Sequence, residues 1–464
     1  SDLGHGVMTT AFAPTDLAAW ARGTWTSSPL APVTGFGTDT RALHAGDTFV
    51  ALKTARRDGH DFLVDARARG AACAVVAHPV ADTLPQLVVD DPQTGLQRIA
   101  AAWRQRFPGP VIGVTGSVGK TSTKDLLGAL LGPTAFITEA NLNNLLGVPL
   151  MLLRLRADLH RFAVIEAGMS VPGELGVSAA VIQPDVAIVT AVAPVHLEGV
   201  GSLAAVAREK ATLVAALAAG GRAVLPASLL AWPEFAALAD RCIAVRFAGE
   251  ANPPVRPARL VEAALGQSEG RRTLSLDGEV FLLGPISDGL ARNAALAVLA
   301  AREVGADLTA LRTALASWAP PVGRGSVHAL SAQTFYVDCY NSSPVSLLDA
   351  ARCFDHLSQG SALPRLWVIG GMAELGVNSA ALHQACGADV PVRAGDAVVT
   401  FGGDAAQVLT GLPVGSGLRR AAATLAEVQA VVSAHAGFIF VKGSRSFALE
   451  RALPTDLSAQ LSFH

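Results

Sequence analysis

The 464-residue sequence has few charged residues. They make up only 16% of the chain, whereas hydrophobic residues make up 51%. A chain this apolar can bury a large interior, which argues against an intrinsically disordered protein. The formal net charge is −2, so the sequence also lacks the strong positive charge of a general nucleic-acid-binding protein. We therefore expect a folded protein of about three domains that does not bind nucleic acid.

Cysteine is also scarce, with five residues far apart in the sequence and no Cys-x-x-Cys pair. This spacing excludes a disulfide framework and a cysteine zinc site, and it indicates reduced thiols. The N-terminus lacks the basic segment and apolar run of a signal peptide. The longest apolar stretch, residues 211–232, is interrupted by Gly220-Gly221-Arg222 and Pro226, so it cannot form a transmembrane helix. We expect a cytoplasmic protein without a membrane span.

The strongest functional signal is a glycine-rich segment that follows an apolar β-branched run at residues 111–114. It reads Thr115-Gly116-Ser117-Val118-Gly119-Lys120-Thr121-Ser122. Glycines allow backbone N–H groups to surround a phosphate, Lys120 supplies a positive charge, and Thr121 offers a hydroxyl to Mg²⁺. Val114 stands where the common pattern has a glycine, so the loop matches the narrower form Thr-Gly-Ser-x-Gly-Lys-Thr. The sequence therefore predicts ATP binding.

Proline-rich breaks divide the chain into three predicted domains, residues 1–107, 108–319 and 320–464. Short apolar runs separated by helical stretches indicate an α/β fold with mainly parallel sheets. Strands are expected near residues 47–52, 72–77, 111–115, 163–166, 186–190, 334–338, 366–369, 397–401 and 438–441, and helices near 121–131, 203–218 and 293–304. We expect a central P-loop domain and a Rossmann-like C-terminal domain, with ligands at the carboxyl ends of the strands.

Further polar residues follow the strands of the central segment. Residues 138–144 contain three asparagines, which either read a polar substrate or form an asparagine-rich turn. Glu166 ends an apolar strand, where it is either a Mg²⁺ ligand or a surface acid. His196 follows the next strand, and its place beside the phosphate loop favours a functional role over a structural one. Lys210 lies among alanines and leucines on a helix, where a buried amine needs a partner or a modification.

Taken together, these motifs resemble those of the Mur ligases, the ATP-dependent amide ligases of peptidoglycan precursor synthesis. The resemblance covers nearly the whole chain. The matching elements, in chain order, are Asp39-Thr40-Arg41, the phosphate loop, Asn141-x-Asn143-Asn144-x-x-Gly147-Val148-Pro149, the Glu166 strand, His196-Leu197-Glu198, Gly323-Arg324-Gly325, Asp338-x-Tyr340-Asn341-x-x-Pro344, Gly370-x-Met372-x-Glu374-Leu375-Gly376 and Lys442-Gly443-Ser444-Arg445.

Within the family, the Tyr-Asn-x-x-Pro and Met-x-Glu-Leu-Gly elements resemble the branch that adds D-alanyl-D-alanine to UDP-N-acetylmuramoyl-tripeptide. This resemblance implies a monomeric cell-wall enzyme that forms an acyl phosphate from ATP and then an amide. The resemblance implies that the catalytic residues are Lys120, Glu166, His196 and Lys210. It implies that two Mg²⁺ ions are held by Thr121, Glu166, His196 and a carbamylated Lys210. It further implies that ATP is bound by residues 115–122, Asn293, Arg324, Asp338, Tyr340 and Asn341, and that the other substrates are contacted by Thr40, Arg41, Asn143, Asn144, Lys442, Ser444 and Arg445.

Departures from the family pattern lie around the nucleotide periphery. Gly289 and Leu290 stand where the family often has His-Asn, and Gly371 stands where an aspartate is usual. These changes leave open the adenine contacts and the choice of substrate, so a ligase that joins a different amino acid or dipeptide is the closest alternative. A phosphotransferase would release ADP without an amide product. A catalytically silent relative would be expected to lose Lys120, Glu166, His196 or Lys210, and all four are present.

Overall fold

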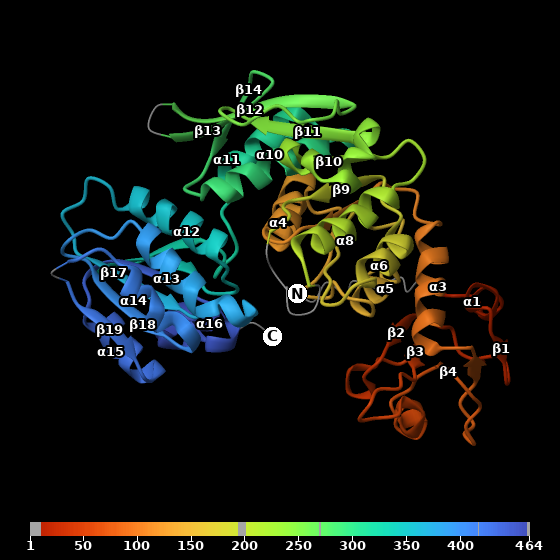
Figure 1. The fold of residues 1–464 in the computed structure, drawn as a ribbon. Coiled ribbons are helices and arrows are strands. Elements are labelled where there is room, and N and C mark those ends of the chain that lie inside the picture. The colour runs from red at the N-terminus through yellow and green to blue at the C-terminus, as the bar shows by residue number, and fades with distance from the viewer. Residues whose placement is uncertain (1–10, 194–200, 269–270, 416, 462–464) are drawn as a thin grey trace, which may run out of the picture.

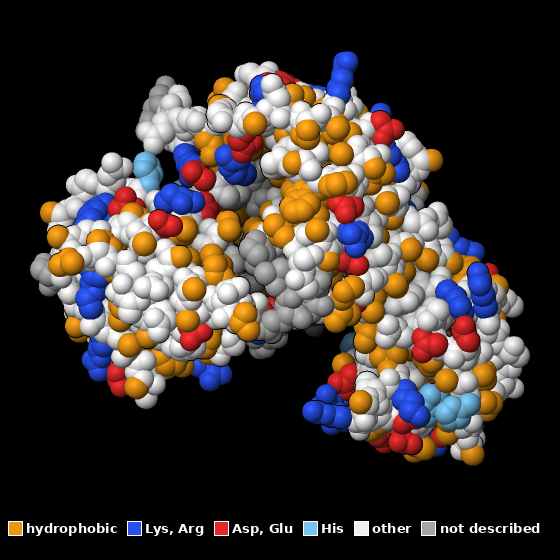
Figure 2. Space-filling model, viewed as in Figure 1, with side chains coloured by type: hydrophobic (Ala, Val, Ile, Leu, Met, Phe, Trp, Pro, Cys, Tyr) orange, Lys and Arg blue, Asp and Glu red, His pale blue; other side chains and the backbone are white. Residues whose placement is uncertain are grey.

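A computed structural model describes residues 11–193, 201–268, 271–415 and 417–461 of the chain. These residues form three β-sheets flanked by helices, which we call the N-terminal, central and C-terminal bodies. The three bodies follow one another as an arc (Figure 1), and open space separates the two end bodies beneath the central one (Figure 2). The α/β architecture predicted from the sequence is confirmed. The domain limits 1–107, 108–319 and 320–464 stay predictions.

The N-terminal body contains a five-stranded sheet in the order β1-β5-β4-β3-β2, parallel except for β1. The predicted strands near 47–52 and 72–77 are present as β3 and β4. The elements of this body are α1 (Pro14–Ala21), β1 (Thr24–Trp25), β2 (Gly35–Gly37), β3 (Asp47–Val50), α2 (Leu63–Ala68), β4 (Cys73–Val76), β5 (Gln86–Val88) and α3 (Pro92–Arg104).

The central body contains a nine-stranded sheet in the order β14-β13-β12-β11-β10-β9-β6-β8-β7. The seven strands from β6 to β12 pair in parallel, and β13 and β14 extend the sheet as an antiparallel ribbon. The strands are β6 (Val111–Thr115), β7 (Ala135–Ile137), β8 (Phe162–Glu166), β9 (Val186–Val189), β10 (Arg222–Pro226), β11 (Cys242–Phe247), β12 (Arg259–Ser268), β13 (Arg271–Leu276) and β14 (Glu279–Leu283). The helices are α4 (Lys120–Leu131), α5 (Gly147–Leu152), α6 (Glu174–Ile182), α8 (Leu203–Ala215), α9 (Pro233–Ala236), α10 (Asp288–Glu303) and α11 (Leu308–Ser317).

The C-terminal body contains a six-stranded sheet in the order β15-β16-β20-β17-β18-β19, parallel except for β15. Its elements are β15 (Ser326–Leu330), β16 (Gln333–Asp338), α12 (Pro344–Leu357), β17 (Arg365–Gly370), α13 (Ser379–Asp389), β18 (Ala397–Phe401), α14 (Ala406–Gly411), β19 (Arg419–Ala422), α15 (Leu425–Ala434), β20 (Gly437–Lys442) and α16 (Thr455–Gln460). No helix among the described residues is both long and apolar enough to pass through a lipid bilayer.

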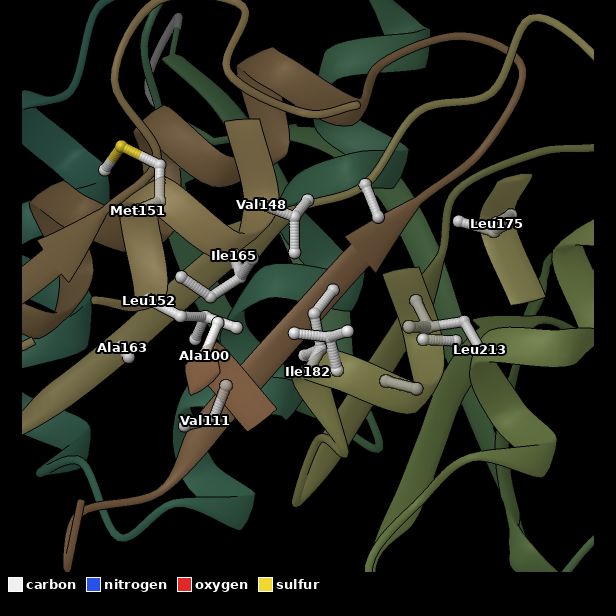
Figure 3. Close-up of a cluster of buried hydrophobic side chains, with 14 of the residues drawn as sticks. Ala100, Val111, Val148, Met151, Leu152, Ala163, Ile165, Leu175, Ile182 and Leu213 are labelled. Atoms are coloured by element: carbon white, nitrogen blue, oxygen red, sulfur yellow. The ribbon is translucent and has the colours of Figure 1, made fainter. Parts of the chain in front are cut away.

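The hydrophobic cores show how the bodies are joined. Strand β6 alternates its side chains, so that Val111 packs with α3, α5, α6 and α8 on one face of the sheet (Figure 3), whereas Ile112 packs with α4, α10 and α11 on the other. The first of these clusters runs on into the N-terminal body through α3. The two clusters of the C-terminal body contain only residues after position 321. The C-terminal body is therefore a separately packed unit.

The order of the strands indicates which edge of the central sheet binds ligands. From β6 the chain passes through α4 to β7 and through α5 to β8, both on one side of β6, and then crosses through α6 to β9 on the other side. In open α/β sheets a ligand binds where the connections diverge in this way, at the carboxyl ends of the strands. The phosphate loop lies at this edge.

Candidate active site

The phosphate loop connects β6 to α4 and is held by its neighbours. Gly116 and Gly119 have φ values of 151° and 83°, which favour glycine. The Ser117 hydroxyl donates to the Ala193 carbonyl at 3.0 Å, and the Thr190 hydroxyl donates to the Val118 carbonyl at 2.5 Å. Gly119 is the residue before α4, and α4 has no side-chain cap. Its first N–H groups therefore remain available to a phosphate.

Lys120 folds back over this loop, and its Nζ donates to the Gly116 carbonyl at 2.7 Å. Burial lowers the pKa of Lys120 below its ordinary value, with the carboxylate of Glu166 opposing this effect and the charge of Arg324 adding to it. A phosphate bound here would favour the charged form of Lys120. Lys120 lies at the N-terminal end of α4, where the helix dipole also favours a bound anion.

Glu166 ends β8 directly beside Thr121. One carboxylate oxygen, Oε1, accepts hydrogen bonds from the Thr121 hydroxyl at 3.1 Å and from the Asn143 amide at 2.8 Å. The side chain is 1% exposed, and its other oxygen, Oε2, has no hydrogen-bond partner among the described residues. A buried carboxylate oxygen without a partner is costly unless a cation or donor meets it.

This arrangement fits Mg²⁺, which prefers a few protein oxygen ligands together with the oxygens of a bound phosphate. Thr121 and Glu166 supply such oxygens. Within the described residues no three His, Cys, Asp or Glu side chains form a metal cluster. The predicted ligand His196 lies outside the described residues, so its role stays a prediction.

Lys210 lies on α8 and is 2% exposed. Burial holds the pKa of Lys210 well below the ordinary value of 10.5; the charge of Lys120 acts in the same direction, and Glu209 opposes it. Such a lowered pKa favours the neutral form of the amine, which is the nucleophilic one.

A cavity of about 710 Å³ lies between the central and C-terminal bodies. The phosphate loop and α10 line it on one side, and the segments around Arg324 and Tyr340 line it on the other. Of the predicted site residues, those that line this cavity are residues 117–122, Asn143, Glu166, Asn293, Arg324, Asp338, Tyr340, Asn341 and Lys442. Asn293 packs against Gly119, where an added Cβ would meet its amide.

Two predicted substrate residues are held within the C-terminal body. Lys442 is 1% exposed, and its Nζ donates to Asp338 Oδ2 at 2.6 Å and to the Asn341 carbonyl at 3.0 Å. Ser444 accepts a hydrogen bond from the Ala373 N–H at 2.9 Å. Lys442 thus orders the segment that carries Asp338 and Asn341. Direct substrate contact by these two residues stays a prediction.

The remaining predicted substrate residues are spread over the molecule. Asn144 binds its own loop, since its Oδ1 accepts from the N–H groups of Leu146 and Gly147. The guanidinium of Arg445 lies 5.4 Å from the Tyr340 ring centroid. Thr40 and Arg41 line a second cavity of about 750 Å³ in the N-terminal body, and Arg41 pairs with Asp39 at 2.6 Å.

Sequence reasoning missed several residues that line the cavity between the central and C-terminal bodies: Ser287, Asp288, Arg292, Asp349 and Arg352. Asp288 and Arg292 belong to the first turns of α10, which begins five residues earlier than the predicted 293 because Ser287 caps it. Asp349 and Arg352 lie within α12, and no local motif distinguishes them from other charged residues of an exposed helix face. Only the three-dimensional arrangement places them at the site.

Comparison with known proteins gives the family. Residues 114–299 match the model of the Mur ligase middle domain, and residues 32–104 match that of the Mur ligase family catalytic domain. The chain is 33% identical over 422 residues to the UDP-N-acetylmuramoyl-tripeptide–D-alanyl-D-alanine ligase of Escherichia coli, covering 90% of this chain and 92% of the relative. This chain belongs to the Mur ligase family.

Other Mur ligases support the same placement. The enzyme of that name from Synechocystis is 33% identical over 380 residues, with 79% of each chain covered. The crystal structure of MurF from Acinetobacter baumannii superposes with a TM-score of 0.83 at 28% identity, covering 97% of this chain and 99% of that one. The three-body fold is therefore a Mur ligase fold over nearly the whole chain, and its named relatives are MurF ligases.

Proposed function

We propose that this chain is an ATP-dependent amide ligase that joins D-alanyl-D-alanine to UDP-N-acetylmuramoyl-tripeptide. The observation that carries the proposal is the pairing of a phosphate loop with Glu166, whose buried oxygen Oε2 has no hydrogen-bond partner among the described residues. The cavity beside it is closed on its far side by cationic and polar residues of a second body. Such a site can hold ATP between two bodies while other substrates approach.

The proposed reaction has two steps. The terminal carboxylate of the peptide attacks the γ-phosphorus of ATP, which forms an acyl phosphate and releases ADP. The amino group of the dipeptide then attacks the acyl carbon, loses a proton and expels phosphate, which leaves an amide. The protein needs no covalent nucleophile, since positioning and charge stabilisation supply the catalysis.

The site residues have the following roles in the proposed reaction. Lys120 meets the β- and γ-phosphates, and the N–H groups at the start of α4 bind their oxygens. Thr121, Glu166 and His196 would hold Mg²⁺, which supplies positive charge to the phosphate oxygens when bound. Arg324 approaches the phosphates from the C-terminal body, and Arg445 binds the carboxylate of the dipeptide. Thr40 and Arg41 contact the uridine nucleotide in the N-terminal body.

Carbamylation of Lys210 is part of the proposal. The neutral amine attacks CO₂, a nitrogen–carbon bond forms, and a proton is lost, so that the side chain becomes an anionic carbamate. The lowered pKa of Lys210 supports this step because only the unprotonated amine is nucleophilic. Carbon-13 NMR of protein equilibrated with ¹³CO₂ tests it. We expect a carbamate signal that is absent from Lys210→Ala and retained by the matched control Lys53→Ala. A Lys210→Ala protein that keeps this signal contradicts the assignment.

The ligase activity is tested by measuring phosphate release with UDP-N-acetylmuramoyl-tripeptide and a panel of amines. We expect D-alanyl-D-alanine to give the highest kcat/KM and an amide product of matching mass. Preference for another amine would identify a ligase with a different second substrate, and ADP release without an amide would identify a phosphotransferase. The monomeric state and the cytoplasmic location belong to the same proposal, and sedimentation of the full chain tests the first of them.

A further inference from the structure

A hydrogen-bonded contact between α10 and α12 crosses the boundary between the central and C-terminal bodies, beside the cavity that the phosphate loop lines. The Gly289 N–H in the first turn of α10 donates to Asp349 on α12, at 3.0 Å to Oδ1 and 3.1 Å to Oδ2. The first N–H groups of a helix have no partner within the helix, and the helix dipole favours negative charge there. Ser287 already accepts from the Leu290 N–H. Asp349 thus adds a second cap to α10, supplied by another body.

The two helices joined by this contact carry the two sides of the cavity. Asn293, one turn further along α10, lies against Gly119 of the phosphate loop. Helix α12 begins at Pro344, directly after the segment that bears Asp338, Tyr340 and Asn341. The contact between Asp349 and Gly289 therefore links the helix beside the phosphate loop to the helix that follows the Tyr340 segment.

Few other contacts join the central body to the C-terminal body in the part of the chain that the structure describes. Among the described residues, the hydrophobic clusters of the C-terminal body include none from the central body. A second polar contact joins Gln267 of β12 to His356 of α12 at 3.3 Å, and His356 is two turns from Asp349 on the same helix face. Between these contacts lies a cavity of about 400 Å³ lined by both bodies. A loosely packed junction of this kind allows the bodies to move unless specific contacts hold them.

Gly289 is suited to this contact because it has no side chain. A Cβ atom at this position would lie 2.5 Å from Asp349 Oδ2, so the carboxylate would have to turn away. Glycine is a weak helix former, and its place in the first turn of α10 lowers helix propensity while permitting the close approach.

We propose that the Asp349–Gly289 contact is a clamp that sets the orientation of the C-terminal body over the phosphate loop. Asp349 is then a positioning residue for the ligase reaction. This inference rests on the proposed function for its kinetic consequences, but its structural consequence can be measured without any activity.

The test uses Asp349→Ala and Gly289→Ala in the full chain, with Asp91→Ala as the matched control. Asp91 also caps a helix with its carboxylate, accepting from the Thr94 N–H at 2.8 Å, but it does so at the start of α3, away from this junction. Small-angle X-ray scattering without nucleotide, the thermal midpoint and the KM for ATP are measured for each protein.

We expect both clamp variants to broaden the scattering distance distribution and to raise the KM for ATP by about tenfold, as for loss of a hydrogen bond to a charged group. Gly289→Ala should lower the thermal midpoint less than Asp349→Ala does, because the helix propensity of alanine offsets part of the lost hydrogen bond. Asp91→Ala should lower the midpoint and change neither of the other readouts. The double variant should show no further rise in KM, because both changes break one contact.

Folded clamp variants with unchanged scattering and unchanged KM would overturn the inference. A raised KM with unchanged scattering would also overturn it, since Asp349 would then act directly on the nucleotide. If Asp349→Ala does not fold, Gly289→Ala alone decides between these results. A wild-type protein without ligase activity would refute the proposed function, whereas the scattering comparison would still test the clamp.

Discussion

The guanidinium of Arg324 stacks on the ring of Tyr340, with its central carbon 3.7 Å from the ring centroid. Arg324 precedes β15, and Tyr340 follows β16, so two neighbouring strands of the C-terminal sheet bring them together. Both residues line the cavity opposite the phosphate loop. The aromatic ring thus holds a cation on the side of the cavity that faces the phosphate loop.

Replacing this ring should weaken the use of ATP. A cation–π contact of about 1–2 kcal/mol corresponds to a roughly five- to thirtyfold change in affinity. We expect Tyr340→Leu to raise the KM for ATP by this factor, and Tyr340→Phe to restore most of it because the ring is retained. Steady-state kinetics of both variants test the point. Equal losses in the two variants would show that the ring does not position Arg324.

Lys120→Ala should abolish ATP turnover and leave the fold intact. Lys120 lies on the phosphate loop, and loss of a positioned charge in a dry site usually lowers kcat by about 10²–10³-fold. The chain contains only five lysines, and Lys53, whose side chain is 76% exposed, supplies a matched control. Lys53→Ala should keep wild-type kcat. A folded Lys120→Ala protein with more than about a tenth of wild-type kcat contradicts the assigned role.

Lys210 should make stability depend on pH in protein depleted of CO₂. Between the lowered pKa of Lys210 in the folded state and its ordinary value of 10.5, the unfolded chain binds a proton that the folded chain does not. The free energy of unfolding should therefore rise with pH across this window, by up to about 1.4 kcal/mol per pH unit. Urea denaturation of wild type and Lys210→Met over this range measures the effect. We expect the slope to be smaller in Lys210→Met, and identical slopes would mean that Lys210 is charged in the folded protein.

Arg445→Ala should act on the amine substrate. Arg445 lies three residues beyond the end of β20, and its guanidinium is 5.4 Å from the centroid of the Tyr340 ring, where it can bind a carboxylate. We expect its KM for D-alanyl-D-alanine to rise far more than its KM for ATP or for the UDP-linked peptide. Arg324→Ala is the matched comparison and should show the reverse pattern between ATP and the dipeptide. Equal changes for all substrates would place the amine site elsewhere.

Much of the parallel core was predictable from sequence because strands buried on both faces appear as continuous apolar runs. The runs near 163–166, 186–190 and 366–369 are present as β8, β9 and β17. The ribbon of β12, β13 and β14 was not predicted. Strand β12 buries only Val261 and Ala263, and β14 alternates exposed and buried residues from Val280 to Leu283, so these strands leave a weaker apolar signal.

The candidate site likewise contains some features that the sequence predicts and others that it does not. The phosphate loop and Glu166 follow strand ends in the sequence, and their neighbourhood could be inferred from the order of a parallel sheet. The Asp349–Gly289 contact joins residues 60 positions apart in different bodies, and it depends on how those bodies are oriented. No periodicity or local motif encodes that orientation.

The central claim, an acyl phosphate formed from the peptide carboxylate, is tested most directly by isotope transfer. UDP-N-acetylmuramoyl-tripeptide labelled with ¹⁸O in its terminal carboxylate is incubated with the full-length protein, ATP, Mg²⁺ and D-alanyl-D-alanine, and the released phosphate is analysed by mass spectrometry. The mechanism predicts one ¹⁸O atom in each released phosphate for each amide formed, because the carboxylate oxygen stays on phosphorus when the amine expels it. Amide formation with unlabelled phosphate, or ADP release without any amide, would contradict the account.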